Sequence, residues 1–96
     1  MPTYISLMKF TEQGIRNVKD HPKRRENAAK GIESMGGKLL HTYLTMGRYD
    51  LVCVIEGPDD ETVARALLTL GSQGNVQTET LPAFTEDQFR KITGAI

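Results

Sequence analysis

Two pairs of side chains could carry acid–base chemistry, and the more coherent of them is His41 and Tyr43, two positions apart in an apolar stretch. In an extended segment alternate side chains share one face, so these two would lie together. A histidine in a pocket could shuttle a proton while the tyrosine orients a substrate oxygen. The alternative is a hydrogen-bonded structural histidine at a sheet edge or interface. The pair becomes a candidate site only if Tyr4, Ser6 or Met8 lines the same cavity.

A second candidate is the adjacent pair Tyr49-Asp50. The tyrosine could donate a hydrogen bond to a carbonyl or enolate, with the carboxylate as general base if a cavity raises its pKa. Neighbouring strand residues point to opposite faces, however, so the two do not readily line one cavity. In the structural alternative the tyrosine packs as a strand residue and the aspartate accepts backbone amides or pairs with Arg48. The catalytic candidates are thus His41, Tyr43 and Asp50, and the ligand-binding candidates are Tyr4, Ser6, Met8, His41, Tyr43 and Tyr49.

Other reactive side chains have simpler interpretations. Cys53 lies between two valines, a setting typical of a buried small hydrophobe. The chain has two histidines and one cysteine, too few to complete an ordinary metal site. We therefore predict neither a metal nor a cofactor. A basic stretch, formed by Lys19, Lys23, Arg24, Arg25 and Lys30, is interpreted as a solvated helix face, with an anionic ligand or acidic partner as the alternative.

Length and charge limit the classes of function. The 96 residues, 1–96, make one domain, and 12 basic side chains balance 12 acidic ones. A neutral chain lacks the electrostatic footprint of nucleic-acid binding, so no DNA or RNA partner is expected. The first residues lack a signal-peptide pattern, and no apolar run reaches the roughly 20 residues of a membrane span. A cytoplasmic protein with no membrane partner is expected.

The hydrophobic pattern places the candidate residues on a sheet. Gly36-Gly37 should close a helix, Gly47-Arg48 should form a tight hairpin, and Pro22 should interrupt the first helical region. The order strand, helix, strand, strand, helix, strand predicts a ferredoxin-like α+β fold, with a four-stranded antiparallel sheet and both crossover helices on one face. The expected strands span 4–10, 38–46, 49–56 and 75–81. The expected helices span 12–19, 22–35, 58–71 and 85–92. The buried stripe of the third helix is predicted to consist of Val63, Ala64, Leu67 and Leu68.

The run Leu51-Val52-Cys53-Val54-Ile55 is apolar at consecutive positions, so both faces of this strand require cover. A chain of this length has helices for one face only. A second subunit packed face to face is therefore predicted, giving a homodimer or a larger oligomer built from dimers.

The chain resembles the GYD-domain family, which is grouped with the dimeric α/β barrels of ferredoxin-like fold. The resemblance rests on Gly36-Gly37-Lys38, on Gly47-Arg48-Tyr49-Asp50-Leu51-Val52, on Pro58-Asp59 and on two later segments, Ser72-Gln73-Gly74-Asn75-Val76 and Thr80-Leu81-Pro82-Ala83-Phe84. It implies this fold and dimerisation. The family has no established activity, so no catalytic residue is transferred.

Three functional hypotheses follow. The leading one is a small cytoplasmic homo-oligomer that binds a small molecule in or near the barrel between paired sheets. The first alternative is a cofactor-independent monooxygenase- or isomerase-like enzyme that acts on a small carbonyl or phenolic substrate. The second is a structural or regulatory oligomerisation module whose facing sheets are packed solid.

Overall fold

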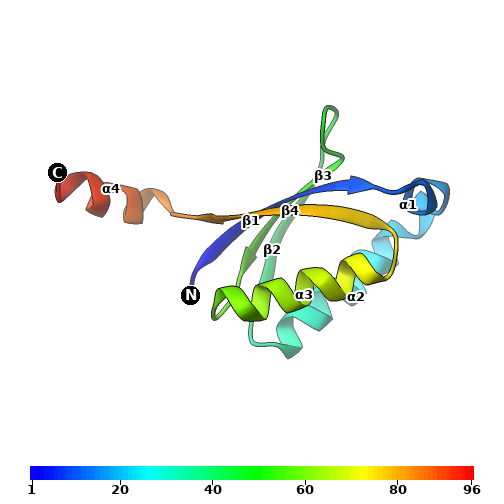
Figure 1. The fold of residues 1–96 in the computed structure, drawn as a ribbon, viewed down its shortest axis with the longest axis horizontal. Helices are drawn as coiled ribbons and strands as arrows, with labels where there is room; N and C mark the ends of the chain where they lie inside the picture. Colours follow the sequence, from blue (N-terminus) through cyan, green and yellow to red (C-terminus); the bar gives the residue numbers. More distant parts are fainter.

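A four-stranded antiparallel sheet in the order β2-β3-β1-β4 organises the chain (Figure 1). The computed structural model describes residues 1–96. The chain order confirms the predicted ferredoxin-like α+β fold, since two helices cross over one face of the sheet. The elements are β1 (Thr3–Phe10), α1 (Glu12–Arg16), a 3-10 turn (Val18–Asp20), α2 (His21–Ser34), β2 (Lys38–Leu44), β3 (Leu51–Glu56), α3 (Asp60–Ser72), β4 (Val76–Ala83) and α4 (Glu86–Gly94).

Helices α2 and α3 lie together on one face of the sheet, and the opposite face carries no helix (Figure 1). Strand alternation directs one set of side chains into the helix layer. Tyr4, Ser6 and Met8 of β1 are buried there, next to the central residues of β3. The buried apolar core consists of Tyr4, Met8, Leu51, Cys53, Ile55, Val63 and Val76.

The remaining positions of the central strands form an apolar surface without cover. Its two rows follow the strand register across all four strands. The first row joins His41, Val54, Ile5 and Leu81, and the second joins Tyr43, Val52, Leu7 and Glu79. We call these eight residues the open sheet face.

Strand β2 departs from the predicted alternation. The register shifts between Leu39 and His41, so a bulge falls at Leu40. Leu39 and Thr42 therefore point to the helix layer, whereas strict alternation along the strand would place Leu40 on the same face as Thr42. Leu44 is 76% exposed at the end of the strand. A bulge inserts one extra residue into a strand, so the side chains before and after it no longer alternate in step. A pattern with a strict period of two does not predict this change.

The connection between β2 and β3 is longer than predicted. Instead of a tight turn at Gly47-Arg48, both strands stop early and residues 45–50 form the loop. Hydrogen bonds from Thr45 hold it closed, with its amide donating to the carbonyl of Asp50 at 2.8 Å and its hydroxyl to that of Tyr49 at 2.6 Å. A loop closed by these two hydrogen bonds of Thr45 thus replaces the predicted two-residue turn.

Helix boundaries follow their capping residues. Pro22 lies in the first turn of α2, where its missing amide costs nothing, and the expected helix before it is divided into α1 and the 3-10 turn. Gly36, with φ of 88°, takes the left-handed conformation after α2, as predicted. Asp59 caps α3 by accepting from the amide of Thr62 at 2.8 Å.

The predicted stripe of α3 is half wrong. Val63 is buried, and Leu67 packs on the core together with Leu70. Ala64 faces away from the core, and Leu68 is 74% exposed. The helix presents positions 63, 67 and 70 to the sheet, so the two outer positions fall on its solvent side.

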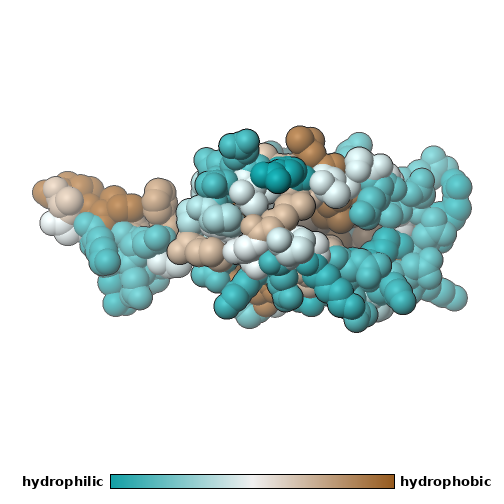
Figure 2. Space-filling model, turned by 90° about the horizontal axis from the view of Figure 1, so that it is seen from below, coloured by the Kyte–Doolittle hydropathy of each residue, from teal (hydrophilic) through white to brown (hydrophobic).

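Helix α4 extends away from the rest of the molecule (Figure 1). It begins at a capping box in which the Thr85 hydroxyl and the Gln88 side chain satisfy each other's backbone amides. Its apolar residues gather on one side (Figure 2), where Phe89 is 57% and Ile92 is 44% exposed. No helix of the chain, α4 included, is long and apolar enough to cross a membrane.

Candidate functional site

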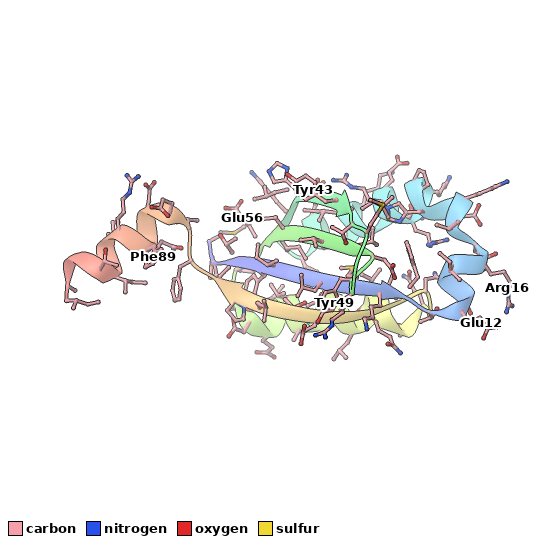
Figure 3. All side chains as sticks on the ribbon, turned by 90° about the horizontal axis from the view of Figure 1, so that it is seen from above. Glu12, Arg16, Tyr43, Tyr49, Glu56 and Phe89 are labelled. Carbon is pink, nitrogen blue, oxygen red and sulfur yellow. The ribbon has the colours of Figure 1, made fainter.

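Three of the seven predicted site residues, His41, Tyr43 and Tyr49, lie on or over the open sheet face (Figure 3). On β2 the rings of His41 and Tyr43 stack with centroids 5.9 Å apart and an interplanar angle of 22°. Both side chains are exposed, Tyr43 by 54%. The two residues share a face as the sequence predicted, next to Val54 and Val52 of β3.

Tyr49 also lies over the open sheet face, on the loop between β2 and β3. Its hydroxyl donates a hydrogen bond to the carboxylate of Glu79 on β4, and this bond raises the pKa of the Tyr49 phenol. The Lys9 ammonium lies 5.7 Å from the centre of its ring. Tyr49 thus reaches across β1 and ties the loop to the far edge strand, with its hydroxyl already engaged.

Asp50 is hydrogen-bonded to the backbone of β1. Its Oδ2 accepts the amide of Phe10 at 2.9 Å, and its own amide donates to the carbonyl of Met8 at 2.8 Å. These contacts extend the pairing of β1 with β3 beyond the last regular strand residue. The geometry therefore favours the structural interpretation of Asp50 over a general base.

The other ligand-binding candidates lie on the opposite side of the sheet. The Tyr4 hydroxyl donates to Asp60 at the start of α3, and this bond, together with burial, raises the pKa of Tyr4 to about 12. The hydroxyls of Ser6 and Thr80 are 2.9 Å apart. The sheet separates Tyr4, Ser6 and Met8 from His41, Tyr43 and Tyr49, so the six candidates do not form a single site.

A cavity of about 220 Å³ lies between the sheet and helices α2 and α3. Met8 is the one ligand-binding candidate in its wall, which is otherwise built mainly from core side chains such as Leu51, Leu67 and Leu70. Cys53 also lines it, and burial raises the pKa of this thiol. Sequence reasoning missed the cavity. The signal that could have indicated it is the small residues on the inner sides of the helices, Ala28, Gly31 and Ala66.

No three histidine, cysteine, aspartate or glutamate side chains lie close enough together to hold a metal ion. Three of the groups whose pKa values are shifted are hydrogen-bonded within the fold: Tyr4 to Asp60, Tyr49 to Glu79 and Asp59 to the Thr62 amide. Asp59, for example, has its pKa lowered by the Thr62 amide that it caps. The structure therefore presents surfaces and a cavity, with no assembled set of acid and base groups.

Comparison with known proteins decides the family. The model of the GYD domain matches residues 4–93. The chain belongs to the GYD domain family. The match covers β1 to α4 and so includes the open sheet face, the cavity and the extended helix, and it confirms the resemblance noted in the sequence.

Two proteins of Thermus thermophilus are similar to this GYD protein. The "Glutamine synthetase and cystathionine beta-lyase binding protein" of that organism is 39% identical over 84 residues, which cover 86% of this chain and 88% of that protein. The crystal structure of TTHA0845, from the same organism, has a TM-score of 0.56 at 24% identity, covering 88% of this chain and 95% of that one. The second relative supports the fold alone.

Proposed function

We propose that this GYD protein is a binding protein without catalysis, which pairs with a second copy through its open sheet face and holds another protein as partner. The observation that carries the proposal is the apolar open sheet face. Ile5, Leu7, Val52 and Val54 lie on it side by side with no helix above them. Monomeric proteins rarely leave such a patch in water.

A second copy is the occupant that fits this surface best. In a dimer with a twofold axis, the same surface of each copy forms the interface. Two identical apolar patches can therefore cover each other. The aromatic pair on β2 and the phenol of Tyr49 would then lie at the rim, where interfaces carry polar groups. A cytoplasmic location remains part of the proposal.

The partner protein is proposed from the relative with 39% identity, whose name states that it binds glutamine synthetase and cystathionine beta-lyase. These two enzymes are the first partners to test. The exposed apolar side of α4 (Figure 2), with Phe89 and Ile92, supplies a surface that the paired sheets would leave available.

The test is the mass of the protein in solution, measured by light scattering. We expect two chains for the native protein and one for Val52→Asp, because a carboxylate would be buried at the centre of the interface and weaken pairing at least tenfold. Ala64→Asp, which adds the same charge on the exposed side of α3, is the matched control and should remain paired. A native protein of one chain, or a paired Val52→Asp, would contradict the proposal.

A second candidate function is small-molecule binding between the paired sheets. The stacked rings of His41 and Tyr43 favour it, since they would border that space with Tyr49. Native mass spectrometry of the purified dimer should then show a bound compound that His41→Ala loses. Repeated preparations with only the bare dimer mass would exclude it. The enzyme alternative requires Asp50 as well, whose carboxylate is bound to the Phe10 amide.

A further inference from the structure

The cavity beneath the sheet has a cationic end and an acidic end. At one end His21, Arg24 and Arg25 of the first turns of α2 contribute to its wall, and at the other Glu56 closes β3. Between them the wall is mainly apolar, with some threonine and amide side chains. These groups lie near opposite ends of the strands, because the His21 ring contacts the Phe10 ring at the end of β1, while Glu56 pairs with Thr3 at its start. A charged molecule inside the cavity would therefore experience an electric field that runs from the cationic end to the acidic end.

The cations at this end form no ion pair within the chain. Arg24 donates from Nη1 to the carbonyl of Asn17 at 2.8 Å, but its Nη2 is buried without a hydrogen-bond partner. Arg25 uses Nε to reach the Thr42 hydroxyl at 3.3 Å. The ion pairs of the chain, Arg16–Glu12, Lys30–Glu26 and Arg90–Glu86, involve neither arginine. A buried guanidinium nitrogen without an acceptor is costly, so this group is suited to an external anion.

The start of α2 adds to this imbalance. Its first turn carries no acidic residue, and Asp20 makes no side-chain capping bond. Lys23, Arg24 and Arg25 thus sit at the positive end of the helix dipole, where basic residues are unfavourable and anions are stabilised. Burial, and then Arg24 and Arg25, lower the pKa of His21, so this ring also avoids positive charge. Apart from the carboxylate of Asp20, the charges and the helix dipole at this end of the cavity favour a negative group.

We infer that the cavity binds a small amphipathic carboxylate, with its apolar part between the sheet and helices α2 and α3 and its carboxylate against Arg24. A dry cavity of about 150 Å³ is known to accept a benzene ring, so 220 Å³ admits a ring or a chain of moderate length. The acidic Glu56 end repels the carboxylate and so sets one orientation. The site lies on the opposite side of the sheet from the open sheet face, and is independent of pairing.

Octanoate and 1-octanol are matched probes, because they share a chain and differ in the charge of the head. Titrated into isotopically labelled protein and followed by amide chemical shifts, octanoate should bind about tenfold more tightly than octanol. The shifts should concentrate in the first turns of α2 and in β3. Arg24→Met should remove the preference for octanoate and leave octanol binding unchanged. Ala66→Leu, which fills the cavity, should weaken both.

Lys23→Met is the control, since it removes one charge from the same turn at an exposed position. Octanoate should bind this variant as tightly as it binds the native protein. The inference is overturned if octanoate fails to bind at millimolar concentration, if octanol binds equally well, or if Lys23→Met weakens octanoate binding as much as Arg24→Met. The comparison of these two substitutions in one helical turn remains decisive if Ala66→Leu does not fold. Val52→Asp should bind octanoate normally, which separates this site from the proposed pairing.

Discussion

Asp50 illustrates how a residue with catalytic potential can be used entirely by the backbone. Replacing it with alanine would leave the Phe10 amide without its acceptor at 2.9 Å. We expect Asp50→Ala to lower the free energy of unfolding by about 1–2 kcal/mol, the usual cost of an unsatisfied partly buried donor. Asp50→Asn keeps an oxygen acceptor and should lose less. Urea unfolding of the three proteins measures this, and unchanged stability of the alanine variant would contradict the structural role.

Tyr4 makes a second prediction, about alkaline pH. Its folded pKa of about 12 lies above the ordinary value of 10.0, because the buried phenol donates to Asp60 at the start of α3. A raised pKa means that the stabilisation is complete below pH 10 and is lost as the pH rises toward 12. The phenolate absorbance of the native protein minus that of Tyr4→Phe should therefore show a step near pH 12. A step near pH 10 would refute the hydrogen bond.

At the level of elements, the close contact between α1 and the start of β4 depends on a glycine. A Cβ on Gly14 would lie 2.0 Å from the carbonyl oxygen of Asn75, whereas one on Gly71 in α3 meets nothing within 4 Å. We expect Gly14→Ala to destabilise the protein by about 1–3 kcal/mol, as overpacking does. Gly71→Ala should stabilise it by roughly 0.5–1 kcal/mol, because alanine is the better helix former.

Thermal or urea unfolding of both glycine variants, compared with the native protein, measures the difference. Equal effects of the two substitutions would show that α1 does not pack on Asn75 as described.

The elements that the sequence predicted well are those with strong periodicity. The alternation of β1 and β3, the glycine stop at Gly36 and the acidic start of α3 each follow from a local physical preference. The bulge at Leu40 and the long connection over 45–50 could not be predicted from local preference. The bulge belongs to the pairing of β2 with β3, and the connection is held in part by contacts of Asp50 with β1 and of Tyr49 with β4, which are far away in the sequence. The register shift at this bulge also explains why Leu39, and not Leu40, pairs with Ile55 of β3.

The candidate site was predictable only in part. That His41 and Tyr43 share a face follows from their spacing, but whether Tyr4 and Ser6 lie with them depends on how the strands pair. The register opposes Ile5 to Val54 and Val54 to His41, which sends Tyr4 to the other side. The cavity depends on the distance between two helices, a property of the packed molecule that no single segment carries.

At the scale of the whole molecule, α4 stands apart from the rest of the fold (Figure 1). Phe89 and Ile92 remain exposed because the helix leaves β4 outward instead of returning over the sheet. We therefore expect a chain ending at Phe84 to unfold with an unchanged midpoint, having lost only the circular dichroism of one short helix. A large fall in the melting temperature would mean that α4 is docked onto the fold.

The projecting helix also determines how the protein moves through water. The molecule measures 49 × 31 × 18 Å, and its radius of gyration of 14.2 Å exceeds the roughly 12.5 Å of a compact domain of this length. An elongated particle experiences more friction than a sphere of equal mass. Even a single chain of 10.7 kDa should therefore elute early from a sizing column and tumble slowly in relaxation measurements. Removing α4 should reduce this drag by more than the lost mass alone would.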